Sequence, residues 1–311
     1  MSRPPARVTI VAGKGGVGKT TVSAALALLA ARAGYRVLIV DVDGQSGLPA
    51  LFDRSEPVAY AASTMWRAGD GPGSVAARAL TPDDALVEYL EDRGMRRISK
   101  RLSATGTLDL IATAVPGIRD ILVLGKVKQI EQRMAAGMED APDFIVVDAP
   151  AAGHAVSFLS SAYGLLEAAT VGPIRAQAAD VVSMLSDAER FQVMLVTLPE
   201  ETPVNEAVDT AFHLEDRAAV KLGPIVVNGL WPCLDLPVTR TPIQSLAPGD
   251  TARLEAAAEF RRRRQDQQAQ QWTRLGQDLP LPQMPLPFLF TTELGLNEVT
   301  VLAAALEAGM P

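Results

Sequence analysis

Residues 13–20 read Gly-Lys-Gly-Gly-Val-Gly-Lys-Thr, so that two glycines bracket four residues and a lysine and a threonine follow directly. In such a loop the backbone N–H groups can turn toward phosphate oxygens, and the helix that follows adds the positive end of its dipole. The final lysine of this motif contacts the β- and γ-phosphates, and the threonine hydroxyl coordinates Mg²⁺. The stretch therefore predicts a phosphate-binding loop for a nucleoside triphosphate.

The sequence on either side of this phosphate loop (residues 13–20) agrees with that interpretation. Residues 8–12 form an uncharged apolar run, typical of a strand buried on both faces of a parallel sheet. Residues 20–32 are rich in alanine and leucine and stop before Gly34, which predicts a helix with a glycine C-cap. The alternative, a glycine turn without a ligand, is disfavoured because strand, loop and helix follow in the required order. The expected nucleotide-binding residues are Gly13, Gly15, Gly16, Val17, Gly18, Lys19, Thr20 and Thr21.

Aspartates follow two further apolar runs. Residues 37–41 end in Asp41-Val42-Asp43, and residues 144–147 are followed by Asp148. Because side chains alternate along a strand, Asp41 and Asp43 would project to the same side, at the strand edge where α/β sheets bind ligands. Carboxylates at this edge can hold Mg²⁺ in phosphate-loop proteins. Each aspartate alone could cap a loop, but together they predict a metal site that includes Thr20, Asp43 and Asp148.

Two more strands are expected at residues 193–197 and 224–227, and the second of them runs into Asn228. A side-chain amide has one acceptor and two donors, which can recognise the edge of an adenine ring. An asparagine after a strand is otherwise a common turn residue.

Composition limits the class of protein. The 311 residues, 48% of them hydrophobic, fit a globular α/β chain that can bury a sizeable core. A formal net charge of -7 gives no attraction to nucleic acid or to anionic membranes, so neither is expected as a stable partner. The single cysteine, Cys233, excludes an internal disulfide. Since no apolar run reaches the roughly 18 residues that span a bilayer, a cytoplasmic protein is expected.

Several stretches carry a family resemblance. Residues 14–21, Lys-Gly-Gly-Val-Gly-Lys-Thr-Thr, resemble the signature of the deviant Walker A ATPases, the group of the arsenical-pump, tail-anchored protein targeting, cell-division and partition ATPases. Residues 148–154, Asp-Ala-Pro-Ala-Ala-Gly-His, are similar to the Asp-Thr-Ala-Pro-Thr-Gly-His of the arsenical-pump and targeting branch. Asn228 falls where that family places its adenine-contacting asparagine. Residues 43–45 and 116–128 resemble the paired actinobacterial ArsA-like members, which are thought to work as two different subunits.

The resemblance implies a fold and a mechanism. The fold would be a single domain over residues 1–311, with a mainly parallel sheet flanked by helices and helical insertions near 56–105 and 155–190. The activity would be Mg²⁺-dependent hydrolysis of ATP to ADP and phosphate, coupled to formation of a homodimer or of a heterodimer with a paralogous ATPase subunit. Lys14, Lys19 and Asp43 would be catalytic: Lys14 would cross to the partner's phosphates, and Asp43 would position the water. Asp148 would hold Mg²⁺ through its waters.

Departures from the family pattern keep other functions open. Gly44-Gln45 replace the proline and alanine that usually follow the first aspartate, so the chain could be a nucleotide-binding regulatory subunit of a heteromeric ATPase. A partition-type ATPase is disfavoured by the acidic charge. Arsenite binding is disfavoured by the single cysteine, and GTP remains an alternative to ATP. A hydrophobic protein client could bind the helical insertions.

The last third of the sequence predicts a long helix, an extended segment and a final helix. Residues 251–272 are expected to be helical, with four consecutive arginines at 261–264 on a solvated face. Residues 279–287 alternate proline with leucine and are expected to be extended. The final helix would begin with Asn297 as its N-cap and bury Val299, Leu302 and Leu306.

Overall fold

A computed structural model describes residues 4–42, 47–92, 94, 117–233 and 250–310. In these residues one sheet has the strand order β3-β4-β2-β5-β1-β6-β7-β8. All neighbouring strands are parallel except β3 and β4. The strands are β1 (Val8–Gly13), β2 (Arg36–Asp41), β3 (Ser63–Arg67), β4 (Ser74–Ala79), β5 (Phe144–Ala151), β6 (Phe191–Thr197), β7 (Ile225–Leu230) and β8 (Gln283–Pro287). The expected α/β fold with a mainly parallel sheet is therefore confirmed.

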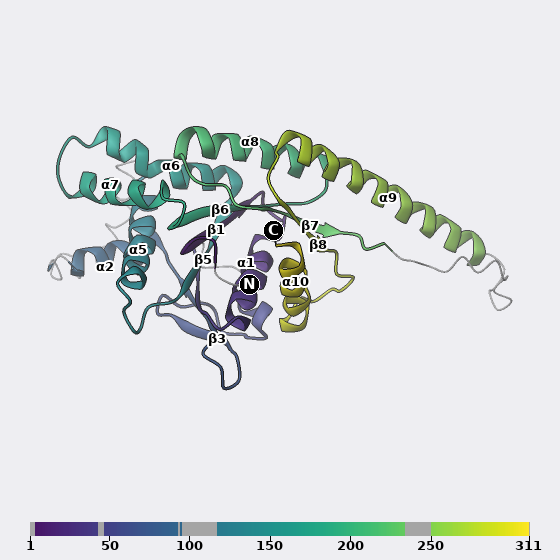
Figure 1. Cartoon of the computed structure of the whole chain (residues 1–311), viewed down its shortest axis with the longest axis horizontal. Coiled ribbons are helices and arrows are strands. Elements are labelled where there is room, and N and C mark those ends of the chain that lie inside the picture. Colours follow the sequence, from purple (N-terminus) through teal and green to yellow (C-terminus); the bar gives the residue numbers. More distant parts are fainter. Residues whose placement is uncertain (1–3, 43–46, 93, 95–116, 234–249, 311) are drawn as a thin grey trace.

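Helices cover both faces of this sheet (Figure 1). Helices α1 and α10 pack against each other on one face, and α5, α6, α7 and α8 lie on the other. The long helix α9 extends from the body as an arm. The helices are α1 (Lys19–Arg32), the short 3₁₀ helix η1 (Ala50–Phe52), α2 (Pro82–Asp92), α5 (Ile118–Ala135), α6 (Ala152–Ala168), α7 (Pro173–Leu185), α8 (Glu201–Ala218), α9 (Asp250–Asp278) and α10 (Leu296–Gly309).

The sheet order decides where a ligand can bind. Strand β1 is buried along its whole length between β5 and β6. Helix α1 leads the chain from β1 past β5 to β2, whereas β6 and β7 lie on the other side of β1. A crevice at the carboxyl ends of the strands, where the strand order diverges, is the usual ligand site of open α/β sheets. The phosphate loop follows β1 at this point.

The sequence prediction for residues 56–105 was partly wrong. Residues 63–67 and 74–79 form the antiparallel strands β3 and β4, and a helix, α2, begins only at Pro82. In β4 the buried residues Val75, Ala77 and Ala79 alternate with less buried ones, which is the period of two that defines a strand. Residues 95–105 lie outside the described residues. The second expected insertion, 155–190, is largely helical, as α6 and α7.

The C-terminal segments follow the sequence prediction with one correction. Helix α9 is six residues longer at its carboxyl end than expected, and β8 occupies most of the extended segment. Helix α10 begins at Leu296 rather than after Asn297. The reason is that Asp53 Oδ1 accepts a hydrogen bond from the Leu296 N–H at 3.2 Å, while Glu298 Oε2 accepts one from the Gly295 N–H at 3.0 Å. The expected Val299, Leu302 and Leu306 are buried.

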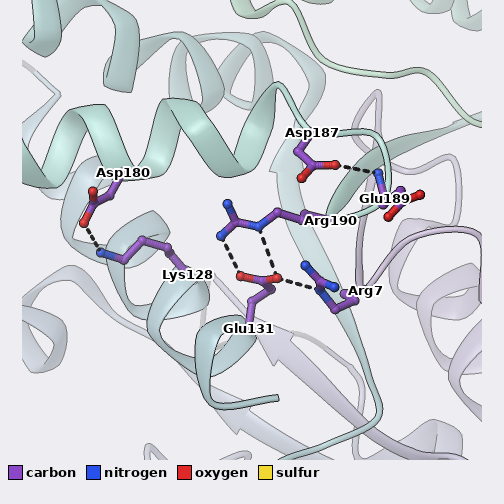
Figure 2. A network of polar contacts seen from close by, with 7 residues as sticks. All are labelled: Arg7, Lys128, Glu131, Asp180, Asp187, Glu189 and Arg190. Atoms are coloured by element: carbon purple, nitrogen blue, oxygen red, sulfur yellow. Dashed lines mark hydrogen bonds and ion pairs between the residues drawn. The ribbon is translucent and has the colours of Figure 1, made fainter. Parts of the chain in front are cut away.

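A buried carboxylate holds the opposite, amino-terminal edge of the sheet together (Figure 2). Glu131 of α5 accepts hydrogen bonds from Arg7, just before β1, at 2.6 Å and from Arg190, just before β6, at 2.7 and 3.2 Å. Its side chain is 1% exposed, so its charge is balanced by the two guanidinium groups rather than by water. We refer to Arg7, Glu131 and Arg190 as the amino-edge clamp.

Candidate functional site

Two glycines of the phosphate loop allow close approaches that no other residue permits. A Cβ on Gly13 would lie 2.2 Å from the Val196 carbonyl oxygen of β6. Gly18 has a φ of 93°, and a Cβ there would lie 2.4 Å from Nδ2 of Asn228. By contrast, Gly15 and Gly16 are exposed and face open space. The loop is thus held at both ends by its neighbours, and its middle is accessible.

Asn228 fixes the far end of this loop. Its Nδ2 donates a hydrogen bond to the Val17 carbonyl at 2.8 Å, which connects the end of β7 to the phosphate loop. The sequence associated Asn228 with adenine, and that role stays a prediction. The contact with Val17 joins residues 211 positions apart, so it was not visible in the sequence.

The two lysines of the loop lie in different directions. Lys19 donates a hydrogen bond from Nζ to the Lys14 carbonyl at 3.2 Å, so its ammonium group lies across the loop, where a phosphate would be met. Lys14 Nζ instead donates to Glu206 Oε1 of α8 at 2.6 Å. The sequence prediction assigned no role to Glu206 at this site. The two residues are 192 positions apart, and no local pattern connects them.

The hydroxyl group of Thr20 contacts the predicted metal-binding aspartate. Thr20 Oγ1 donates to Asp148 Oδ2 at 2.7 Å, and Ser23 Oγ donates to Asp148 Oδ1 at 3.2 Å. Thr21 lies half-buried beside them in the first turn of α1. Ser23 was missing from the expected site, although its i,i+3 spacing from Thr20 places both hydroxyls on one helix face. The structure therefore brings Thr20 and Asp148 together, as the sequence predicted, while Asp43 lies outside the described residues.

Asp148 is held in an environment that disfavours its charge. Burial, together with the nearby charge of Asp41, raises the pKa of its carboxyl group to about 6. The hydrogen bonds from Thr20 and Ser23 and the charge of Lys19 act in the opposite direction. Asp41, the last residue of β2, pairs in register with Asp148 of the adjacent strand β5, and both are buried. The site thus has excess negative charge near neutral pH that a cation would offset.

These donors fit Mg²⁺. Within the described ranges no group of three or more His, Cys, Asp and Glu side chains is arranged to hold a metal ion. Mg²⁺ does not need such a group, because it is usually bound by one or two protein oxygens, several waters and the phosphates of the substrate. The Thr20 hydroxyl and the Asp148 carboxylate are two hard oxygen donors of this kind, 2.7 Å apart.

The raised pKa of Asp148 predicts how stability depends on pH in the metal-free protein. The unfolded carboxyl titrates near 3.8 and the folded one near 6, so folding binds a proton between these values and stability falls as pH rises through them. We expect Asp148→Asn, which cannot ionise, to increase the free energy of unfolding by about 2 kcal/mol at pH 8 and by much less at pH 4. Urea unfolding in EDTA at several pH values measures this. Exposed Asp209→Asn is the control, and equal pH profiles for wild type and Asp148→Asn would contradict the prediction.

Comparison with known proteins places the site in a family context. Residues 8–141 match the family described as the CobQ/CobB/MinD/ParA nucleotide binding domain. This range includes the phosphate loop, β2 and α5, and the match agrees with the α/β phosphate-loop fold seen here.

Similar proteins are named ATPases. The ATPase BagA of Mycobacterium tuberculosis is 37% identical over 230 residues, which cover 71% of this chain and 64% of BagA. An arsenical pump-driving ATPase of Escherichia coli is 30% identical over 227 residues, 70% of this chain and 34% of the pump protein. One from Acidiphilium multivorum is 28% identical over 239 residues, 74% of this chain and 35% of the relative. The aligned part of the chain thus spans less than two thirds of these relatives, whose names are consistent with the ArsA-like resemblance.

Proposed function

We propose that this chain, in which residues 8–141 are a CobQ/CobB/MinD/ParA nucleotide-binding domain, hydrolyses ATP to ADP and phosphate with Mg²⁺. The observation that carries the proposal is the arrangement after β1. Lys19 lies across an accessible phosphate loop, and Thr20 is hydrogen-bonded to buried Asp148 of the adjacent strand β5. The names of the similar proteins support ATP hydrolysis as the activity.

Each residue of the site has a proposed role. The N–H groups of the loop and Lys19 bind the β- and γ-phosphates, and Thr20 and Asp148 hold the metal ion. When bound, Mg²⁺ neutralises charge on the phosphate oxygens. Asp43, two residues beyond Asp41, orients the attacking water. Asn228 recognises the adenine edge from the end of β7, beside the loop that it already contacts.

Lys14 is proposed to act across a dimer interface. An ammonium group from a second subunit would stabilise the negative charge that develops on the transferred phosphoryl group. Lys14 must then leave Glu206, but both side chains of this ion pair are more than a third exposed. Such a pair contributes only about 0–1 kcal/mol, so it does not prevent the change of partner. Dimer formation would thereby control hydrolysis.

The proposal is tested by measuring phosphate release from ATP by the purified chain with Mg²⁺ and with EDTA. We expect wild-type turnover only with Mg²⁺, and Lys19→Ala to lose nucleotide binding and at least 100-fold in activity, because it removes the ammonium from the loop. Exposed Arg217→Ala, in the last turn of α8, is the control. Activity of Lys19→Ala equal to wild type would refute the assigned site.

A second candidate function is a nucleotide-binding regulatory subunit of a heteromeric ATPase. The observation that favours it is Gly44-Gln45, where the resembled family has proline and alanine. The same purified chain distinguishes the two functions, because a regulatory subunit would bind ATP tightly and show no turnover until a paralogous subunit is added. A partition-type ATPase would instead bind duplex DNA in a strongly salt-dependent manner, and the net charge of -7 disfavours this.

A cytoplasmic location is also part of the proposal. In the described part of the chain no helix combines the length and apolar character needed to cross a membrane. The second helical insertion, formed by α6 and α7, remains a proposed surface for a hydrophobic protein client.

A further inference from the structure

A half-open, mainly apolar cavity lies at the amino-terminal edge of the sheet, opposite the phosphate loop. Its volume is about 410 Å³, which falls in the range of small-molecule sites. Phe144, Met194 and Met284 line it from β5, β6 and β8. Leu26 of α1 and Met310, directly after α10, line it from the helical layer on that face. The cavity thus lies between the sheet and two helices and is bounded mainly by apolar side chains.

Three methionines are among the residues that line the cavity. Met194 and Met284 are almost fully buried, while Met310 is half-buried. Methionine side chains are unbranched and polarisable and can adapt to an apolar ligand of varying shape.

Two buried polar side chains share one part of the cavity. Gln192 Nε2 donates a hydrogen bond to Thr9 Oγ1 at 3.0 Å, and both residues line the cavity. A Cβ at position 223 would lie 3.1 Å from Gln192 Oε1, so Gly223 leaves room beside that oxygen. This hydrogen bond gives each of the two side chains a partner within the protein.

One charged residue lines the cavity among the described residues. Lys221 lies just before β7 and is exposed, and none of the ion pairs found in the described ranges includes it. No aspartate or glutamate of the described residues lines this cavity. An apolar interior with a single cation at its edge is complementary to a molecule with an apolar chain and one anionic head.

We propose that this cavity binds an aliphatic monocarboxylate, with its alkyl chain among the methionines and its carboxylate at Lys221. The cavity is separate from the nucleotide site. Thr9 and Gln192, which line the cavity, are the second residues of β1 and β6, whereas the phosphate loop lies at the opposite, carboxyl end of β1. Binding there can be tested whether or not the chain hydrolyses ATP.

The test uses the full chain with ¹³C-labelled methionine methyl groups and sodium decanoate, below its micelle concentration, as the probe. We expect saturable shifts of the Met194, Met284 and Met310 methyl signals. Met65 and Met184, which are buried elsewhere, should not shift. Absence of saturable shifts, or equal shifts at all these methionines, would overturn the proposal.

Variants then test the head group and the cavity separately. Lys221→Gln should weaken decanoate binding about tenfold, because it removes a charge-assisted hydrogen bond, and should leave decanol binding unchanged. Met310→Trp should abolish decanoate binding by filling the cavity, while Val301→Trp on the exposed side of α10 should not. Decanoate binding that is insensitive to both Lys221→Gln and Met310→Trp would refute the assigned site.

Discussion

Lys14→Ala is expected to reduce ATP turnover about 10³-fold while nucleotide binding is retained. The reason is that an ammonium or guanidinium group inserted from outside a phosphate site acts mainly on the charge of the transition state, with effects of roughly 10³ to 10⁵. Lys14 Nζ does not lie in its own loop but at Glu206, 2.6 Å from a carboxylate oxygen, so its loss should not disturb the bound nucleotide. Separate measurements of ATP turnover and of nucleotide affinity check that the first falls while the second is retained.

Mixing two inactive variants shows whether Lys14 acts between subunits. Lys19→Ala lacks the loop ammonium but still has Lys14, whereas Lys14→Ala has the reverse defect. If Lys14 crosses to the partner, mixed dimers regain one complete site and the mixture recovers part of the activity. No recovery from a mixture shown to contain mixed dimers would mean that Lys14 acts within its own chain.

Glu206→Gln is the matched control for this experiment. It removes the ion pair with Lys14 but keeps the lysine and a side chain of nearly equal size. We expect turnover at or above the wild-type level, because the exposed ion pair contributes little and Lys14 becomes free to move. If Glu206→Gln reduced ATP turnover as much as Lys14→Ala does, the loss of turnover would be due to the broken ion pair rather than to the missing ammonium group.

Glu131→Ala is expected to give the largest loss of stability, about 3–5 kcal/mol in the free energy of unfolding. The substitution removes the carboxylate of the amino-edge clamp and leaves Arg7 and Arg190, which are 28% and 17% exposed, beside each other without the carboxylate that both contact (Figure 2). Urea unfolding monitored by circular dichroism measures the loss. Turnover below the unfolding transition should be nearly unchanged, since the clamp lies at the edge opposite the phosphate loop.

Two controls separate the buried clamp from ordinary surface charge. Asp140→Ala breaks the ion pair between Arg133 and Asp140, whose side chains are 45% and 68% exposed, so we expect a loss of at most about 1 kcal/mol. Glu131→Gln keeps a side chain that can form hydrogen bonds but removes the charge. Its loss of unfolding free energy should therefore lie between that of Glu131→Ala and that of the surface control. A loss below 1 kcal/mol for Glu131→Ala would show that the arginines are solvated well enough without it.

The sequence by itself determined the phosphate loop, the strand before it, the helix after it and the apolar strand that leads into Asp148, although β5 continues beyond Asp148 to Ala151. These features depend on residues close together in the chain. Glycines define the loop, uncharged apolar runs define buried strands, and an aspartate after such a run lies at the carboxyl edge of the sheet. The same local logic missed β3 and β4, because their alternating pattern is short and contains small residues that also suit a helix.

Only the tertiary structure decided which distant residues meet. Lys14 contacts Glu206, Asn228 holds the Val17 carbonyl, and Asp53 sets the start of α10, each across nearly 200 residues or more. These contacts depend on the order of strands in the sheet, which places β7 and α8 beside the loop and which no local pattern encodes. The pKa of Asp148 follows from the same cause, because burial and the neighbouring Asp41 arise only when β2 and β5 pair. Local residue types thus specified the chemistry of the site, and strand order specified its geometry and electrostatics.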